Sequence, residues 1–295
     1  MVAIGERIYL GHPNDAYITV VDKNGVIQDV IGQPGLGPGE LGRGVLAMTA
    51  WKNDLYVVSS SRPRQLTWFR DGVFKNQIHL PSINIKFASS NANTFAAANG
   101  TVMFPAHPST KRLANAITAD KQIPVGKLLF DKRHIDLIRR IPAVNDTNWQ
   151  YENGFWYAVF KFHPMIQKYD SEFNLVETFN IKNGFTNNRH EELLDYDPER
   201  FSSAPPLFYD FKVKDGAMYL SLTGGILKLS PSGETEKLFT FYGSGESFAS
   251  LGNAGVTLNL PFFVVLDDGE LLLSSFGESW GHPIWLAKTS KPNKR

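Results

Sequence analysis

The sequence contains an internal repeat of about 50 residues, and this repeat limits the possible folds more than any other feature. Each copy begins with an apolar segment, a tight polar turn and a second apolar segment. The six first turns lie at Gly5–Glu6, Lys52–Asp54, Asn99–Gly100, Glu152–Gly154, Lys214–Gly216 and Asp267–Gly269. The segments after these turns are almost continuously apolar, as expected for strands that are buried on both faces.

Each copy continues with a third apolar segment, a second turn and a more polar fourth segment. The second turns include Asp-Lys-Asn-Gly at 22–25, Asp-Gly at 71–72 and Ser-Pro-Ser-Gly at 230–233. Asn-Gly and Asp-Gly pairs favour tight hairpins because these residues adopt positive φ at low cost. The fourth segments mix polar and apolar residues, which is typical of outer edge strands. Each copy therefore predicts a four-stranded antiparallel sheet.

Six consecutive sheets of this kind predict an all-β fold, a six-bladed β-propeller with four-stranded antiparallel blades. We expect a single domain over residues 1–295, because the pattern runs through nearly the whole chain. The expected blades span roughly residues 1–31, 45–80, 93–141, 147–181, 207–242 and 259–289. The last copy stops after its third strand, so that blade either lacks a strand or is closed by the N-terminal strand. Met1–Ile4 is either this closing strand or the inner strand of the first blade.

Three segments depart from the repeat. In the third copy we expect an inserted loop at Ala106–Gly126, followed by a third strand at Leu128–Asp131 and a fourth at Ile135–Ile141. The other insertions are Asn183–Pro206, with a short helix predicted within it at 189–196, and Gly243–Leu258. Long loops on a rigid scaffold commonly carry binding residues.

Composition excludes several classes of protein and site. The chain has no cysteine, which excludes disulfides, thiolate nucleophiles and cysteine-ligated zinc. Its net charge is +1 with both signs interspersed, whereas a nucleic-acid partner requires a basic stripe. No apolar run approaches the roughly 18 residues of a membrane-spanning helix. We expect a monomer with no nucleic-acid partner and no transmembrane segment.

A glycine-rich segment, Ile31–Val45, lies between two predicted strands and is too rich in glycine and proline to form helix or strand. Its motif Ile-Gly-x-x-Gly-x-Gly-Pro-Gly-Glu at 31–40 follows an Asp-x-x-Gly hairpin. This combination resembles the NHL-like six-bladed β-propellers, in particular poorly characterised proteins of Bacteroidota-type bacteria. The resemblance implies a periplasmic or cell-surface protein without an assigned activity.

A His-Pro pair follows four of the second strands, at His12, His107, His163 and His282. Repeat symmetry would bring these histidines to one rim of the propeller, where imidazoles can hold a divalent metal ion that activates water. Some six-bladed propeller lyases, which this chain resembles in blade number, hold metal in this way. The alternative is that the proline favours a turn and each histidine only hydrogen-bonds to neighbouring backbone, because the offsets differ between copies and no partner carboxylate is evident.

Five further residues are candidates for ligand binding. Trp149 and Trp280 are expected in loops, where they could stack on a sugar or an aromatic ligand, and Tyr151 lies beside the first of them. Arg62 and Glu40 lie in segments expected at the rim. The sequence contains no evident catalytic set, so whether the protein is an enzyme stays open. We expect it to bind a small molecule, a glycan or a protein; the alternative is a metal-assisted lyase or hydrolase using the rim histidines.

Overall fold

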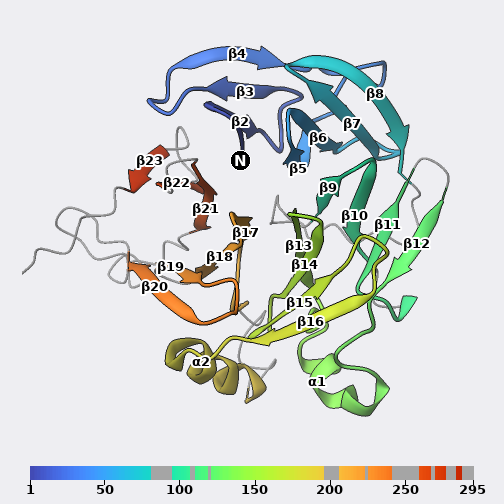
Figure 1. The fold of residues 1–295 in the computed structure, drawn as a ribbon. Coiled ribbons are helices and arrows are strands. Elements are labelled where there is room, and N and C mark those ends of the chain that lie inside the picture. The colour runs from blue at the N-terminus through green and yellow to red at the C-terminus, as the bar shows by residue number, and fades with distance from the viewer. Residues whose placement is uncertain are drawn as a thin grey trace, which may run out of the picture. The chain divides into compact units, whose positions relative to one another are not determined.

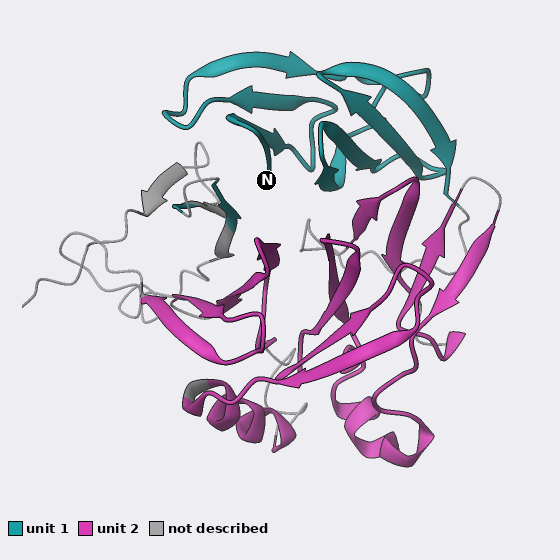
Figure 2. Cartoon of the chain, viewed as in Figure 1, with its two compact units in different colours: residues 1–80, 242–295 teal, residues 81–241 magenta. Residues whose placement is uncertain are grey.

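A computed structural model describes residues 1–80, 95–106, 110–118, 121–195, 206–222, 225–240, 259–266, 270–276 and 284–287. The chain is an all-β propeller built from four-stranded antiparallel blades (Figure 1). It divides into two compact units, one formed by residues 1–80 and 242–295 and the other by residues 81–241 (Figure 2). Each unit has its own sheets and its own hydrophobic core.

The first unit contains two complete blades and a three-stranded sheet. The first blade has the order β1-β2-β3-β4, with strands Val2–Ile4, Arg7–Gly11, Ile18–Val21 and Ile27–Ile31. The second has the order β5-β6-β7-β8, with strands Val45–Trp51, Asp54–Ser59, Gln65–Arg70 and Val73–His79. The three-stranded sheet is β21-β22-β23, formed by Asn259–Val265, Leu271–Phe276 and Ile284–Ala287. Strand β1 lies next to β5 and β21.

The second unit contains three complete blades. The first of them is β9-β10-β11-β12, with strands Ala96–Ala98, Thr101–Pro105, Ala114–Ile117 and Gln122–Val125. The next is β13-β14-β15-β16, with strands Thr147–Glu152, Phe155–Phe160, Met165–Tyr169 and Leu175–Asn180. The third is β17-β18-β19-β20, with strands Phe211–Lys214, Ala217–Leu222, Gly225–Leu229 and Thr235–Thr240. Strand β13 lies between β9 and β17.

Short helices occupy the connections between blades of the second unit. The 3₁₀-helix η2, Lys132–His134, and helix α1, Ile135–Arg140, lie between β12 and β13. Helix α2, Gly184–Leu194, lies between β16 and β17. The helix expected at 189–196 is therefore present, although it begins five residues earlier. The predicted insertion at 243–258 lies outside the described residues.

Five complete blades are thus formed, and within the described residues β21–β23 has no fourth strand. Met1–Ile4 was expected to be either the closing strand of the last blade or the inner strand of the first blade, and the structure decides between the two. Strand β1 pairs antiparallel with β2, with Val2 opposite Tyr9, and is the inner strand of the first blade.

The prediction for the third and fourth strands of the third blade is wrong. Its third and fourth strands are β11 and β12, both inside the segment that was expected as an inserted loop. Leu128–Asp131 forms no strand, and Ile135–Ile141 is largely helix α1 instead of an edge strand. The blade's strands thus lie within Ala96–Val125, whereas the expected range was 93–141.

Three of the first turns, all in the second unit, have the backbone conformation that their sequences predict. Asn99 and Gly100 have φ of 49° and 73°, and Asp215 and Gly216 have φ of 51° and 80°. Two successive residues with positive φ form the type of hairpin turn whose twist matches the flanking strands. These turns therefore fix the pairing of the first and second strands.

The outer hairpins of several blades share one construction. Asp22 Oδ1 accepts hydrogen bonds from the backbone N–H groups of Asn24 and Val26, at 2.8 and 3.0 Å. Asp170 Oδ1 accepts the equivalent bonds from Glu172 and Asn174, both at 2.9 Å. In both of these blades the pairing of the third and fourth strands shifts by one residue just before the turn. A β-bulge and a side chain bonded to the turn together set the register of these hairpins.

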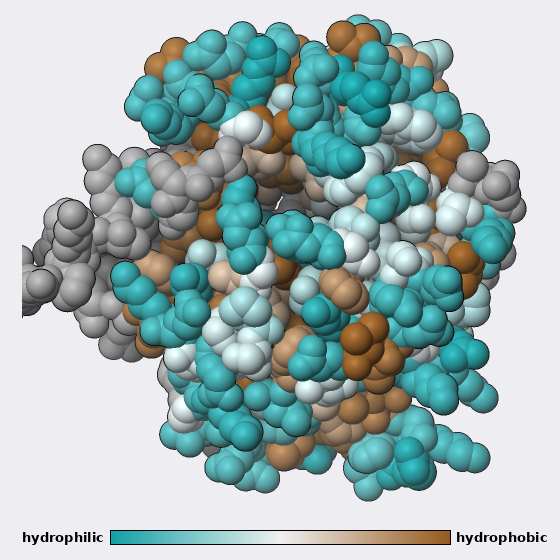
Figure 3. Space-filling view, in the orientation of Figure 1, coloured by the Kyte–Doolittle hydropathy of each residue, from teal (hydrophilic) through white to brown (hydrophobic). Residues whose placement is uncertain are grey.

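Burial follows the position of each strand in its blade. All six residues of β6 are buried, whereas four of the five residues of β4 are exposed. Most of the exposed large apolar residues lie on the outer strands, including Ile27, Val30, Val73, Leu175 and Leu238. Figure 3 shows apolar side chains lying among hydrophilic ones on the viewed face. The outer strands are therefore amphipathic edges, as the sequence predicts.

Candidate functional site

The connections of each unit differ between the two ends of the blades. Because neighbouring strands are antiparallel, the first-to-second and third-to-fourth connections share one end, and those that the structure describes in full are tight turns. The second-to-third connections and the links between blades share the other end, here called the loop end. Among the expected site residues that the structure describes, His12, Glu40, Arg62 and His163 are at the loop end.

Residues 32–44, here called the glycine loop, connect β4 to β5 and are held by their own contacts. The Glu40 carboxylate accepts hydrogen bonds from the Gly37 backbone N–H at 2.6 Å and from Gln33 Nε2 at 3.1 Å. At Gly35, φ is 137° and a Cβ would lie 1.9 Å from Glu40 Oε2, so only glycine fits there. Glu40 was expected to bind a ligand; in the structure its carboxylate organises the loop.

The glycine loop packs against the second-to-third loops of both neighbouring blades. The Val45 backbone N–H donates to the His12 carbonyl oxygen at 2.8 Å. A Cβ at Gly44 would lie 2.0 Å from the Pro13 carbonyl oxygen, and one at Gly42 would lie 2.8 Å from Ser61 Cβ. Three segments at the loop end of the first unit are thus fixed against one another.

His12 is held against its own blade. Its Nε2 lies 3.0 Å from Thr19 Oγ1, and its ring centroid lies 4.7 Å from that of Tyr17. Both contacts are to side chains of the first blade, Thr19 in β3 and Tyr17 in the loop before it, and a metal-binding role for His12 stays a prediction.

Arg62 is exposed in a serine-rich loop that follows β6. Ser59 and Ser61 share a hydrogen bond between their hydroxyl oxygens at 2.6 Å, and the Ser61 hydroxyl donates to the Pro63 carbonyl oxygen at 2.9 Å. Burial and the charge of Arg62 lower the pKa of Arg64. The loop therefore carries two close, exposed guanidinium groups on a backbone held by side-chain bonds, and Arg62 can meet an anionic group.

The two aromatic candidates of the second unit lie in strand β13, so the expectation that Trp149 lies in a loop is wrong. Trp149 is 0% exposed, and its Nε1–H donates to Thr147 Oγ1 at 2.9 Å. Tyr151 lies near the turn end, where its hydroxyl accepts from Asn99 Nδ2 at 2.8 Å. Trp149 is therefore a core residue, and Tyr151 joins two neighbouring blades at the end opposite His163.

The loop end of the second unit brings together two histidines from separate elements. His163 lies between β14 and β15, and His190 lies in α2. Nδ1 of His163 and Nε2 of His190 are 2.9 Å apart and share a hydrogen bond, with ring centroids 4.6 Å apart and planes at 78°. Both side chains are half-buried.

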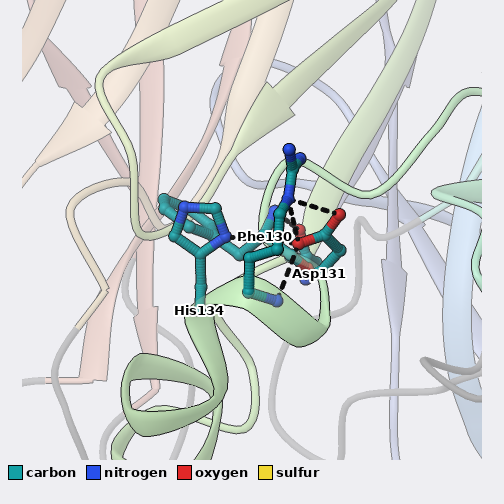
Figure 4. A network of polar contacts seen from close by, with 5 residues as sticks. Phe130, Asp131 and His134 are labelled. Atoms are coloured by element: carbon teal, nitrogen blue, oxygen red, sulfur yellow. Dashed lines mark hydrogen bonds and ion pairs between the residues drawn. The ribbon is translucent and has the colours of Figure 1, made fainter.

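Phe130 lies against this histidine pair and separates it from a third histidine. Its ring makes edge contacts with His163 and with His134, at centroid distances of 5.7 and 5.2 Å. Figure 4 shows Phe130, Asp131 and His134 together at the start of the helical connection. Asp131 accepts from the backbone N–H and Nε of Arg133, which lowers its pKa to about 2, and His134 Nδ1 lies 3.5 Å from it. His134 is therefore paired with a carboxylate on the far side of Phe130.

Burial keeps both members of the pair neutral. The pKa of His163 falls to about 4, first because of burial and second because of the nearby His190. Burial also lowers the pKa of His190, against an opposing effect of Glu191. At neutral pH the two imidazoles therefore retain lone pairs that can act as hydrogen-bond acceptors or metal ligands.

The four-histidine metal site expected from the sequence stays a prediction. His107, His282 and Trp280 lie outside the described residues. Within the described part of the chain, no group of three or more His, Asp or Glu side chains is arranged to hold a metal ion. The partner of His163 is His190, which the repeat could not indicate because α2 belongs to an insertion without a counterpart in the other copies.

Comparisons by sequence give no relative: no protein-family model and no curated protein matches the chain. By structure the chain is similar to streptogramin B lyase, at 11% identity and a TM-score of 0.51, over 97% of this chain and 80% of that one. It is similar to the β-propeller domain of Cps50 (Swd1) from Myceliophteria thermophila, at 7% identity and a TM-score of 0.51, over 97% and 84% of the chains. A putative exported protein of Bacteroides fragilis matches at 14% identity and a TM-score of 0.50, over 93% and 80%. At these identities the likenesses show the β-propeller fold alone.

None of the helices in the described residues has the length and apolar character that a membrane span needs.

Proposed function

We propose that this chain is a six-bladed, NHL-like propeller of the Bacteroidota type that binds a small molecule, a glycan or a protein at its loop end. The proposed location is the periplasm or the cell surface. The motif at 31–40 supports the family and the location through its resemblance, and one similar structure is itself named as a putative exported protein.

The observation that carries the binding proposal is the contrast between the two ends of the blades. In the first unit the described first-to-second and third-to-fourth turns are tight hairpins, whereas the loop end carries the glycine loop and the serine-rich loop with Arg62. In the second unit the loop end carries the helices α1 and α2. The glycine loop is fixed by Glu40 and by contacts to two blades, so it forms a rigid base beside exposed groups. Ordered loops on a rigid scaffold are where binding sites are commonly found.

Arg62 gives this proposal a specific test. Because the group is exposed and lies beside a second arginine, we expect it to contact a carboxylate or another anionic group of the ligand. The purified chain is screened by thermal shift against acidic oligosaccharides, aromatic carboxylates and acidic peptides. For each ligand found, Arg62→Ala is expected to weaken binding by at least about tenfold, which corresponds to about 1.4 kcal/mol.

The matched control is Arg7→Ala, because Arg7 is an exposed arginine at the turn end of the same unit. Unchanged affinity in this variant, together with the loss in Arg62→Ala, supports binding at the loop end. Equal effects of the two substitutions, or no effect of either, contradict it.

The second candidate function is a metal-assisted lyase or hydrolase that uses His12, His107, His163 and His282. The observation that favours it is the neutral, half-buried imidazole of His163 at the loop end. Elemental analysis of the purified chain and a thermal melt with and without a chelator test this candidate. It is rejected if no stoichiometric metal is present and the melting temperature does not change.

A further inference from the structure

His163 and His190 approach each other from two elements that are far apart in the sequence. One belongs to the loop between β14 and β15, and the other to helix α2. Their facing ring nitrogens are 2.9 Å apart. The contact therefore links the β14–β15 loop to the helix that connects β16 to β17.

This separation suits two ligands of one metal ion. Imidazole nitrogens bind first-row divalent ions at about 2.0–2.1 Å, so two ligands at a right angle lie about 2.9 Å apart, and tetrahedral ligands about 3.3 Å. The observed 2.9 Å matches the first geometry and is a few tenths of an ångström below the second. To bind one ion, the donor ring takes the tautomer that carries its proton on the other ring nitrogen, and the rings turn so that both lone pairs point at the ion.

The surroundings of the pair also suit a metal ion. Both side chains are only half-buried, which leaves room for water on the open side. Phe130 packs edge-on against His163 and limits its movement, and the charge of Glu191 acts on His190. A positive ion would thus meet an oriented nitrogen pair with a carboxylate nearby.

We propose that His163 and His190 form a two-histidine site for a divalent, imidazole-binding metal ion such as Cu²⁺, Ni²⁺ or Zn²⁺. No third His, Asp or Glu of the described residues joins them, so the remaining coordination positions are open to water or to a ligand atom. Among these ions Cu²⁺ is expected to bind most tightly. The inference goes beyond the binding function proposed above, because the pair can take up a metal whether or not Arg62 contacts a ligand.

The test uses the full chain, with Cu²⁺ and Zn²⁺ as probes. Electron paramagnetic resonance of the chain with one equivalent of Cu²⁺ is expected to show two imidazole nitrogens bound to the ion. Isothermal titration with Zn²⁺ is expected to give one site. The Zn²⁺ affinity should fall at least about tenfold in His163→Gln and in His190→Gln, because each substitution removes one of the two ligands. Loss of an outer-shell partner alone typically costs about tenfold or more.

The matched control is His134→Gln, because His134 lies across Phe130 from the pair and bonds to Asp131. Zn²⁺ affinity in this variant is expected to equal that of the wild type. The proposal is overturned if the resonance spectrum shows fewer than two nitrogens, if neither ion binds, or if His134→Gln weakens binding as much as the two substitutions in the pair. Should these two variants fail to fold, the spectrum of the wild-type chain decides.

Discussion

Arg140 Nη1, at the end of α1, donates a hydrogen bond to the backbone carbonyl oxygen of Leu194 at the end of α2, over 2.6 Å. The last carbonyl groups of a helix have no partner within the helix, so the guanidinium caps α2 from a separate segment. The two helical connections on either side of His163 are thereby joined.

Removing this cap is expected to loosen α2 while leaving the blades folded. In Arg140→Ala the amide groups of residues 184–194 should exchange faster with solvent, and the free energy of unfolding should fall by about 1 kcal/mol. Hydrogen exchange read by mass spectrometry measures the local effect. Arg139→Ala is the control, because Arg139 is the exposed neighbour in the same helix. Equal exchange in the two variants would contradict the capping role.

Glu40 is expected to act through the stability of the glycine loop. Glu40→Ala removes the acceptor of the Gly37 N–H and of Gln33 Nε2, and the loss of a hydrogen bond to a charged group costs about 1.5–3 kcal/mol. Urea unfolding measures the change, with Glu6→Ala at an exposed turn as the control. An unchanged unfolding midpoint in Glu40→Ala would show that these bonds do not hold the loop.

Trp149 is expected to behave as a core residue. Its indole is 0% exposed and packs near Tyr169, with ring centroids 5.5 Å apart. Trp149→Ala should therefore lower the free energy of unfolding by about 3–5 kcal/mol through the cavity it leaves. Guanidinium unfolding followed by circular dichroism measures this loss. A variant with nearly wild-type stability would instead favour an exposed, ligand-facing indole.

Tyr169 makes the stability of the chain sensitive to alkaline pH. Burial raises its pKa to about 12, whereas the phenol of an unfolded chain titrates near 10. The folded state thus resists ionisation, so the contribution to stability is present below about pH 10 and is lost as the pH rises toward 12.

Tyr169→Phe cannot ionise and is expected to lose less stability over this range than the wild type. At neutral pH the same variant should be about 1 kcal/mol less stable, because the Tyr169 hydroxyl donates to Gln167 Oε1 at 2.6 Å. Unfolding by urea at a series of pH values measures both effects. If the free energy of unfolding falls equally with rising pH in the wild type and in Tyr169→Phe, Tyr169 is not the cause of the alkaline loss of stability.

The repeat predicted most strands because, in most copies, the turn residues and the apolar pattern indicate the same strand positions. In the third copy they disagreed: Leu128–Asp131 has the apolar composition of a third strand, and the true outer strand, β12, contains Pro124. Proline is tolerated on an edge strand, but it weakens the sequence signal of a strand. The apolar residues Ile135, Ile138 and Ile141 recur every three residues, which is closer to helical spacing than to the alternation of a strand.

The site was less predictable than the fold because its contacts cross insertions. Repeat symmetry correctly put His163 in a second-to-third loop, yet its contact with His190 depends on where α2 folds back. The position of Trp149 was misjudged by only a few residues, since β13 begins at Thr147 and includes it. Local pattern thus indicates which end of a blade a residue occupies, but only tertiary packing determines its partner.

The bulged outer hairpins also have a consequence for how the chain folds. Pairs such as Val20 with Asp29 and Gln167 with Thr178 join residues that are close in sequence, and each turn is closed by its own side chain. Such local pairs cost little chain entropy to form, so these hairpins are expected to appear on the microsecond scale, ahead of the longer-range docking of blades. Each repeat would then carry its own nucleus for assembly.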